Sequence, residues 1–317
     1  MNGKPAGASG GGVVETRGLT KVFRDFWRRP KVTAVDELSV RIAAGEIYGL
    51  LGPNGSGKST TIKILLGLLH PTAGEAVVLG RSPRHVATKR GIGYLPEESH
   101  LYPYLSPRET LTFYGRLFGL RGGVIRRRTA ELLDMVGLAH AADRPVGEFS
   151  KGMMRRVGLA QALINDPRLV ILDEPTAGLD PIGCRQIKDL MLALARRGKT
   201  VLLSSHLLAD VEDVCDRIGI LFNGRLRAQG EVAQLLEKRD RMRFTVPCLS
   251  TEQLQTVLGL LKQHAGSEPD VDHPALNLEQ FFLRVVREAH RDTASAGSTA
   301  AGGAVPAWLG DGEEADS

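Results

Sequence analysis

Short apolar runs alternate with longer stretches of helical periodicity along most of this chain. Residues 47–51, 169–172 and 200–203 are almost wholly apolar, which is typical of parallel strands covered on both faces. Residues 150–164 and 182–196 instead repeat their apolar side chains at helical spacing. This alternation predicts an α/β fold built on a mainly parallel sheet.

Two further patterns modify this core. Residues 13–19 and 33–42 resemble strands ahead of the parallel sheet, and we expect them to form an N-terminal antiparallel β part. Residues 107–137 are helical in pattern and interrupt the alternation, so a helical subdomain at about 97–165 is expected. Asn223-Gly224 is a hairpin signal that leads to a last strand near Leu226.

The domain boundaries follow from composition. We expect a disordered leader at 1–12, a main domain at 13–230 and a small α+β accessory segment at 231–289. The accessory segment would hold elements at 241–246, 251–263 and 276–288. Residues 290–317 are rich in Ala, Gly, Ser and Thr and end in acidic residues, which predicts a disordered tail.

Charge and cysteine content restrict the function classes. The net charge is +5, but the basic clusters are short and scattered, so we interpret them as solvated faces and expect no nucleic-acid partner. The clusters are Arg28-Arg29, Arg126 to Arg128, Arg155-Arg156 and Arg196-Arg197. The three cysteines lack metal-ligand spacing, and no apolar run approaches the ~18 residues of a membrane helix. We expect the chain to stay in the cytoplasm as a reduced protein.

The stretch from Gly52 to Ser59 fits the G-x-x-x-x-G-K-[ST] phosphate loop at every fixed position. An apolar strand precedes it and a helix pattern at 60–69 follows, as the motif requires. The glycines let backbone N–H groups turn inward toward phosphates. Lys58 would reach the β- and γ-phosphates of ATP, and the Ser59 hydroxyl would ligate Mg²⁺. The predicted nucleotide-binding residues of this stretch are Gly52, Asn54, Gly55, Ser56, Gly57, Lys58, Ser59 and Thr60.

Charged residues end two of the predicted parallel strands. Asp173 and Glu174 follow 169–172, and His206 follows 200–203. Ligands of open α/β sheets bind outside the carboxyl ends of the strands, so these side chains and the phosphate loop are expected at one edge. Asp173 suits the Mg²⁺ shell, and Glu174 suits the base that orients and deprotonates water. His206 either contacts the γ-phosphate or caps the next helix; the residues before it leave both open.

Two helix starts carry polar residues with two interpretations each. Ser150 precedes the helix pattern at 150–164, and a serine with Gly152 at a helix start is either an N-cap or an anion site. Asp180-Pro181 is an N-cap followed by proline at the first helical position. Phe23 lies with Phe26 and Trp27 near basic residues; one of these rings stacks on a nucleotide base, or all of them pack against protein.

Taken in order, these segments resemble the ATPase subunits of ABC transporters over about residues 13–230. The resemblance rests on GPNGSGKST (52–60), GYLPEE (93–98), FSKGM (149–153), LVILDEP (169–175), AGLD (177–180) and LLSSH (202–206). The GYLPEE and SKGM variants resemble the branch that serves type-two (multidrug and antibiotic-resistance) export permeases. Residues 278–283 also resemble the closing element of that branch.

The resemblance implies a mechanism that the residues alone do not show. Two subunits, expected to be a homodimer, would pair head to tail around two ATP molecules. Ser150 and Gly152 of one copy would then bind the γ-phosphate held by Lys58 of the other, with Asp180 at the interface. His206 would sense the γ-phosphate and Glu174 would be the catalytic base. Phe23 is the aromatic we assign to adenine stacking, although the segment around 25–30 is inserted relative to the family.

The resemblance also implies a partner and a location. A separate polytopic permease would dock on the helical subdomain near 95–140, which places this chain on the cytoplasmic face of the cell membrane. Two departures from the family pattern stand out. Glu97 occupies the position of a glutamine that touches Mg²⁺, where a carboxylate is still a suitable ligand. FSKGM replaces the common LSGGQ but keeps the serine and one glycine. The rival class is a soluble ABC ATPase that acts on nucleic acid or ribosomes.

Overall fold

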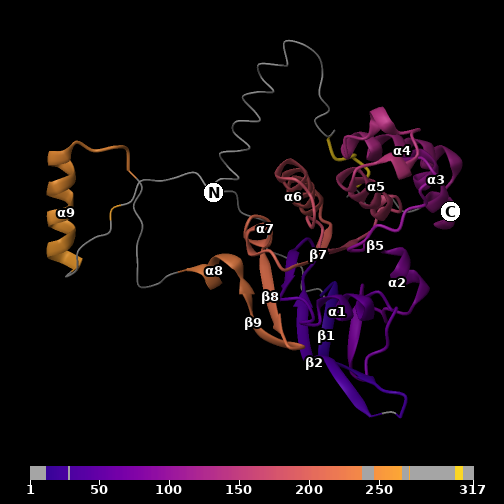
Figure 1. Ribbon diagram of the computed structural model, residues 1–317, viewed down its shortest axis with the longest axis horizontal. Helices are drawn as coiled ribbons and strands as arrows, with labels where there is room; N and C mark the ends of the chain where they lie inside the picture. The colour runs from indigo at the N-terminus through magenta and orange to yellow at the C-terminus, as the bar shows by residue number, and fades with distance from the viewer. Residues whose placement is uncertain (1–11, 28, 238–245, 266–270, 272–303, 310–317) are drawn as a thin grey trace. The chain divides into compact units, whose positions relative to one another are not determined.

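The computed structural model of the protein describes residues 12–27, 29–237, 246–265, 271 and 304–309 (Figure 1). The chain divides into two compact units. The first, here called the main unit, contains residues 1–235 and 298–317, and the second contains residues 236–297. All of the residues predicted to bind or hydrolyse nucleotide belong to the main unit.

A six-stranded sheet forms the centre of the main unit, in the order β5-β6-β7-β3-β8-β9. The strands from β5 to β8 run parallel, and β9 returns antiparallel to β8. Asn223 (φ 50°) and Gly224 (φ 77°) form the tight turn between the last two strands, as their sequence predicted. The strands are β3 (Ile47–Leu51), β5 (Ile92–Leu95), β6 (Leu169–Asp173), β7 (Thr200–Ser205), β8 (Arg217–Phe222) and β9 (Arg225–Glu231).

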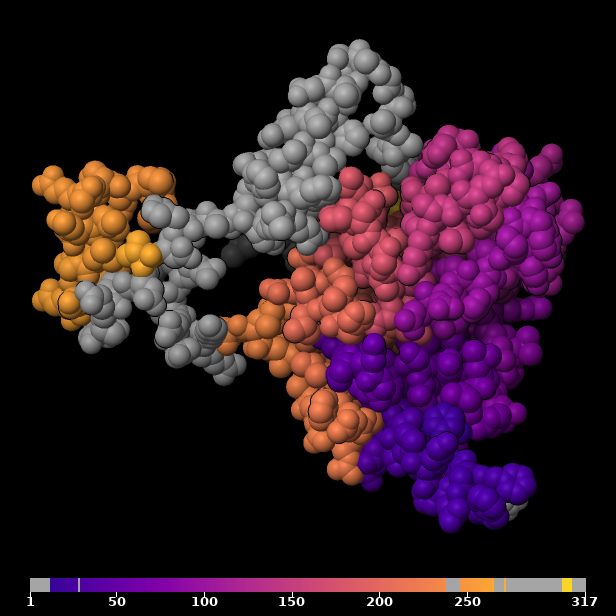
Figure 2. All heavy atoms as spheres, in the orientation of Figure 1, coloured from indigo at the N-terminus to yellow at the C-terminus, as the bar shows by residue number. Residues whose placement is uncertain are grey.

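The N-terminal residues form a separate three-stranded antiparallel sheet in the order β2-β1-β4, which confirms the predicted antiparallel part. Its strands are β1 (Val14–Arg24), β2 (Pro30–Ile42) and β4 (Ala73–Val78). The segment around residues 25–30, which the family resemblance led us to expect as an insertion, lies at the turn between β1 and β2. The Asp25 N–H donates to the Arg29 carbonyl at 2.9 Å and closes this turn. The hairpin tip projects from the surface of the main unit at its indigo end (Figure 2).

The helices of the main unit fall into two groups. Five helices, α1, α2, α6, α7 and α8, each follow a sheet strand, and the block between β5 and β6 is helical, as predicted. The block begins at a capping box, in which the side chains of Ser106 and Glu109 each accept the other's backbone N–H. Pro107 occupies the first position of the helix. The helices are α1 (Lys58–Leu65), α2 (Val86–Arg90), α3 (Pro107–Leu117), α4 (Gly122–Met135), α5 (Lys151–Leu163), α6 (Pro181–Arg196), α7 (Leu208–Glu212) and α8 (Val232–Leu236). Within the described residues, none of the helices is both long and apolar enough to span a membrane.

Helix α1 is shorter than the predicted 60–69 because a glycine stops it. Gly67 has a left-handed φ of 67°, and a Cβ at this position would lie 2.6 Å from the Pro83 carbonyl oxygen. The chain therefore turns away from the helix at this point even though the apolar residues continue.

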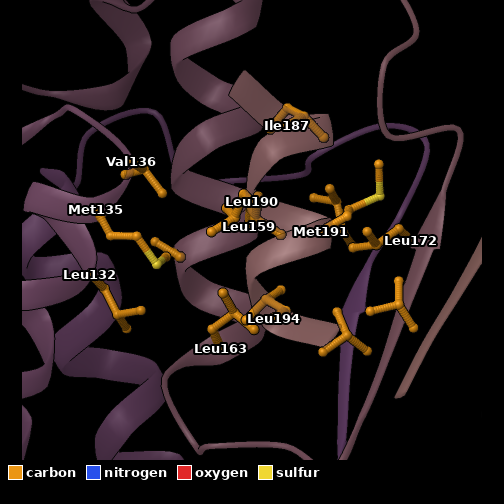
Figure 3. Packing of buried hydrophobic residues seen from close by; sticks show 14 of the residues in the cluster. Leu132, Met135, Val136, Leu159, Leu163, Leu172, Ile187, Leu190, Met191 and Leu194 are labelled. Atoms are coloured by element: carbon orange, nitrogen blue, oxygen red, sulfur yellow. The ribbon is translucent and has the colours of Figure 1, made fainter. Parts of the chain in front are cut away.

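Both faces of the parallel sheet are covered, which explains the continuous apolar runs of its strands. Tyr48, Leu50 and Ile171 pack on one face with α1 and the antiparallel sheet. Val170, Leu172 and Leu203 pack on the other face with α5 and α6. Figure 3 shows this second cluster continuing from Leu172 through α5 and α6 to Leu132, Met135 and Val136 of α4. One core thus joins the helical block to the sheet that carries the phosphate loop.

Residues 304–309 differ from the disordered tail expected at 290–317. The Trp308 side chain is 8% exposed and Leu309 is fully buried in the core shared by α4 and α6. The Trp308 indole N–H donates to the Glu131 carboxylate, and the Arg128 guanidinium lies 4.2 Å from the indole ring centroid. Composition predicted disorder because small residues surround a single tryptophan, whose burial is a tertiary effect.

The second unit is described only in part. Its described helix, α9 (Thr251–Ala265), lies where an element was predicted at 251–263. The elements predicted at 241–246 and 276–288 lie outside the described residues, apart from Val246. The predicted leader, except Gly12, also lies outside them.

Candidate functional site

The phosphate loop joins the end of β3 to the start of α1, and its glycines are required by close backbone contacts. Gly52 has φ 153°, and a Cβ there would lie 2.3 Å from the Leu221 carbonyl oxygen. Gly57 has φ 107°, and a Cβ there would lie 2.3 Å from the Ala34 carbonyl oxygen. Any larger residue at either position would push the loop away from the strands beneath it.

The remaining residues of the loop have the exposure that a phosphate site needs. Asn54 and Gly55 are exposed at the tip, and Gly55 has a left-handed φ of 79° with open space where a Cβ would point. Ser56 is buried beneath the loop, and its carbonyl accepts from the Gly224 N–H at 3.0 Å. Ser59 and Thr60 lie partly exposed in the first turn of α1.

Lys58 is held across the loop by two kinds of contact. Its ammonium donates to the Gly52 carbonyl at 2.7 Å and lies 3.5 Å from a carboxylate oxygen of Glu174. Only 6% of Lys58 and 5% of Glu174 are exposed, so the pair lies in a weakly screened environment. The lysine therefore spans the place where the phosphate loop faces the end of β6.

The acidic pair lies at the carboxyl end of β6, next to the end of β7, as the sequence predicted. Ser204 bridges the two strands, since its hydroxyl donates to Asp173 Oδ1 at 2.5 Å and accepts the Glu174 N–H at 3.0 Å. Glu174 adopts a left-handed φ of 49°, which is strained for a residue with a side chain. Sequence analysis did not identify Ser204 as part of the site, although its place in the run Leu202-Leu203-Ser204-Ser205-His206 marks it as a strand-end residue.

His206 lies beside the acidic pair. Its Nδ1 atom is 2.8 Å from Glu174 Oε2, while its side chain keeps 44% of its surface exposed. His206 is not the residue that caps α7, because the N-cap position is Leu207. The structure thus removes the capping alternative and leaves the imidazole at the open edge of the site.

The possible anion site at Ser150 and the predicted N-cap at Asp180 both have N-cap geometry. The Ser150 hydroxyl accepts the Met153 N–H at 3.3 Å, and the Asp180 carboxylate accepts the Gly183 N–H at 2.6 Å. Ser150 and Asp180 are exposed and Gly152 is partly exposed, so both helix ends face away from the protein interior. N-capping and exposure together mean that Ser150 and Gly152 are accessible to a second molecule.

Phe23 lies near the end of β1 and is 39% exposed, with the Lys21 ammonium 5.3 Å from its ring centroid. Phe26 and Trp27 lie beyond it at the hairpin tip, where their rings meet edge to face at a centroid distance of 5.8 Å. All three rings are therefore open to solvent on the hairpin rather than buried, and adenine stacking by Phe23 stays a prediction.

The prediction that the basic clusters are solvated is wrong for Arg155, the first residue of the Arg155-Arg156 cluster. Arg155 on α5 is 4% exposed, and its guanidinium donates to backbone carbonyls that follow β5 and β6. Burial lowers the pKa of this guanidinium, and the carboxylates of Asp173, Glu97 and Glu174 oppose that shift. The same surroundings raise the pKa of Tyr94 to about 12, mainly through burial and then through Asp173. A sequence signal existed, because Arg155 lies in the first turns of a helix that faces a buried strand.

The oxygen atoms at this edge suit a magnesium ion bound together with phosphate. The bridge to Ser204 occupies Oδ1 of Asp173, which leaves Oδ2 for a metal, and Ser59 offers a hydroxyl across the site. The Glu97 side chain is exposed, while its carbonyl accepts from Arg155 at 2.8 Å. Among the described residues, no group of three or more His, Cys, Asp or Glu is arranged as a metal cage. Magnesium ordinarily combines one or two carboxylates with substrate phosphates rather than using such a cage.

Comparison with known proteins agrees with this geometry. A family model described as "ABC transporter" matches residues 35–177. An uncharacterized ABC transporter ATP-binding protein of Synechocystis is 40% identical over 301 residues, covering 87% of this chain and 85% of that protein. A Nod factor export ATP-binding protein I of Rhizobium is 40% identical over 228 residues, covering 71% of this chain and 73% of that protein.

Solved structures match about 70% of this chain. The ATP-binding subunit of an ABC transporter aligns with a TM-score of 0.63 and 32% identity, covering 70% of this chain and 91% of that one. A dimeric ATP-binding cassette in a post-hydrolysis state, bound to ADP and Pi, aligns with a TM-score of 0.64 and 27% identity, covering 69% of this chain and 98% of that one. The phosphate loop, the acidic strand end and the extent of these matches lead to one conclusion: the chain belongs to the ATP-binding subunits of ABC transporters and is an ATPase of that family.

Proposed function

We propose that this protein hydrolyses ATP to drive export through a separate membrane permease. The main observation in favour of ATP hydrolysis is that Lys58 and His206 both contact the Glu174 carboxylate, at 3.5 Å and 2.8 Å, at one edge of the parallel sheet. The name of the Rhizobium relative, Nod factor export ATP-binding protein I, supports export as the direction of transport.

The roles of the site residues follow from their charge and position. Lys58 and the phosphate loop hold the β- and γ-phosphates, with the loop N–H groups and the α1 N-terminus adding positive potential. Glu174 orients a water molecule and takes its proton, and its partner His206 contacts the γ-phosphate. Ser59, Asp173 and the exposed Glu97 would hold a magnesium ion, which would supply positive charge to neutralise the phosphates.

A second copy of the chain completes the site. The exposed start of α5 presents Ser150 and Gly152, whose backbone N–H groups and hydroxyl suit an anion. In a head-to-tail homodimer these groups bind the γ-phosphate held by Lys58 of the other copy, and Asp180 lies at the interface. The dimeric cassette bound to ADP and Pi supports this arrangement, because the alignment covers 98% of that chain and 69% of this one.

The permease contact is assigned to an exposed aromatic cluster that precedes and joins the helical block, here called the aromatic patch and made of Tyr102, Tyr104 and Phe113. Tyr104 is 71% exposed, and the Tyr102 ring touches both Tyr104 and Phe113 at centroid distances of 5.8 and 6.2 Å. A contiguous aromatic group in solvent marks a protein contact. The patch lies a few residues after Glu97, so a permease bound there senses the ATP site and holds this chain on the cytoplasmic face of the membrane.

The test is affinity purification of the tagged Glu174→Gln protein from its own cells with ATP and mild detergent, followed by mass spectrometry. A polytopic membrane protein in stoichiometric amount is the expected result. Tyr104→Ala in the same background should reduce its recovery at least fivefold. Leu68→Ala, which removes a 61% exposed side chain outside the aromatic patch, should leave recovery unchanged. Recovery of ribosomal proteins or nuclease-sensitive nucleic acid without a membrane partner would contradict the proposal.

A further inference from the structure

The Arg155 guanidinium is the most fully bonded side chain at the site. An arginine has five N–H donors in a rigid planar fork. In this structure five backbone carbonyls receive them: Nε–H donates to Pro175 at 3.3 Å, one Nη donates to Pro96 and to Glu97 at 2.8 Å, and the other donates to Asp173 at 2.5 Å and Glu174 at 2.6 Å.

These carbonyls belong to two neighbouring strand ends. Strands β5 and β6 pair in parallel, with Leu95 opposite Leu172. One set of carbonyls, Pro96 and Glu97, follows β5, and the other set begins at Asp173, the last residue of β6, and continues through Pro175. One arm of the fork holds the chain after β5, and the other arm holds the chain after β6. Because the fork is planar and rigid, it fixes the spacing between the two segments as well as their contact with α5.

The backbone held by this fork carries the reacting carboxylates. The Glu174 N–H is bound by Ser204 and its carbonyl by Arg155, so both peptide groups around its strained φ of 49° are restrained. Arg155 also places a buried positive charge among the carboxylates of Asp173, Glu174 and Glu97. Arg155 lies on α5, whose N-cap is Ser150. A shift of the start of α5 would therefore be transmitted through Arg155 to the carboxylates.

We propose that Arg155 is a positioning residue of the ATPase, whose forked guanidinium aligns the Asp173-Glu174 backbone with the Glu97 segment and with α5. The inference rests on the roles assigned above to Asp173 and Glu174. Lysine cannot replace this arginine, because an ammonium keeps the charge but offers three donors without the planar fork. Substrate binding on the phosphate loop does not depend on Arg155, whereas turnover and the magnesium requirement do.

The experiment compares Arg155→Lys with Arg156→Lys in the purified full-length protein. Arg156 is the matched control, since it lies next on the same helix and donates to a single carbonyl, that of Val136, at 3.1 Å. For each variant we would measure kcat and KM for ATP, the Mg²⁺ concentration for half-maximal rate, binding of a fluorescent ATP analogue in EDTA, and the urea unfolding midpoint.

Arg155→Lys should lower kcat by about 10- to 100-fold, because misplaced catalytic groups lose rate steeply with small displacements. Its Mg²⁺ requirement should rise at least threefold, while analogue binding in EDTA stays within threefold of wild type. Arg156→Lys should change each value by less than twofold. A kcat for Arg155→Lys within threefold of wild type would overturn the inference, as would a loss of analogue binding equal to the loss of kcat.

A second variant keeps the test decisive if Arg155→Lys does not fold. Arg155→Gln removes the buried charge and the planar fork but keeps two N–H donors. It should lower kcat at least tenfold with analogue binding intact, and a wild-type kcat in this variant would overturn the inference. Glu174→Gln, run in parallel, separates the two proposals. Fast turnover by Glu174→Gln removes the assigned base, whereas slow Glu174→Gln with fast Arg155→Lys removes only the role of Arg155.

Discussion

Replacing Glu174 with glutamine removes one buried negative charge and changes little else in the structure. The side chain keeps its size, so no cavity forms, and glutamine meets the same backbone demand at φ 49°. Lys58 keeps its hydrogen bond to the Gly52 carbonyl at 2.7 Å. We therefore expect the substitution to cost at most about 3–5 kcal/mol of stability, the usual cost of removing one partner of a buried ion pair, because the remaining Lys58 charge is still hydrogen-bonded.

Turnover is expected to fall by about 10²- to 10⁴-fold. This range is the usual contribution of a positioned general base, and it corresponds to about 3–5 kcal/mol of transition-state stabilisation. An amide cannot accept the proton of the attacking water. The Glu174 carboxylate itself has two basic neighbours, Lys58 at 3.5 Å and His206, whose Nδ1 lies 2.8 Å from Oε2.

ATP should also bind more tightly to Glu174→Gln. At 3.5 Å, and with an effective dielectric constant of 20, the Lys58–Glu174 attraction is about 5 kcal/mol before desolvation. Phosphates that engage Lys58 must compete with this attraction and face the carboxylate charge. A tenfold gain in affinity corresponds to about 1.4 kcal/mol and uses less than a third of that energy.

The assay is phosphate release by purified protein, combined with fluorescence titration of an ATP analogue. Glu212→Gln is the control, because it removes an exposed carboxylate from α7 near the same edge. Turnover of Glu174→Gln within fivefold of wild type would show that Glu174 is not the base. Weaker analogue binding in a folded Glu174→Gln protein would show that the carboxylate does not oppose the phosphates.

Three more perturbations test other parts of the structure. Trp308→Ala should lower the free energy of unfolding by about 3 kcal/mol in urea, since Trp308 is 8% exposed, whereas Trp27→Ala, at a 72% exposed site, should change it by less than about 0.5 kcal/mol. Gly57→Ala should weaken ATP binding more than tenfold, because its Cβ would lie 2.3 Å from a carbonyl oxygen, while Gly123→Ala, where a Cβ meets open space, should bind normally. Burial raises the pKa of Cys215 well above its ordinary value of 9.0, so the unfolded chain loses this proton first and stability falls as pH rises above 9. Urea unfolding should show a loss of about 1 kcal/mol between pH 9 and 10 that Cys215→Ala abolishes; an unchanged slope would exclude Cys215 as its source.

The sequence predicted the parts of the site that depend on local pattern. Residues Gly52 to Ser59 required a strand before them and a helix after them, and both are present. Asp173, Glu174 and His206 were placed together because parallel strands end at one edge of a sheet. The Asn223-Gly224 turn and the N-caps at Ser150 and Asp180 likewise follow from local residue chemistry.

Features that depend on tertiary contact were not predicted. Arg155 was predicted to be solvated as part of a basic cluster, and although its helix faces a buried strand, only the pairing of β5 with β6 brings five carbonyls to its guanidinium. Ser204 is an ordinary strand residue until β7 lies beside β6. Trp308 lies in a stretch whose composition predicts disorder, and it is buried by α4 residues more than a hundred positions earlier in the chain.

The docked position of residues 304–309 has a consequence for how the protein is made. The rest of the main unit ends at residue 235, so about 70 residues are synthesised before its last segment appears, which takes roughly 4 to 14 seconds at ordinary ribosome speeds. During that interval Met135, Val136 and Leu190, which line the groove beside Val305, face solvent without it. A nascent cassette therefore passes through a stage with apolar surface uncovered, when chaperones have access to a site that the finished protein closes.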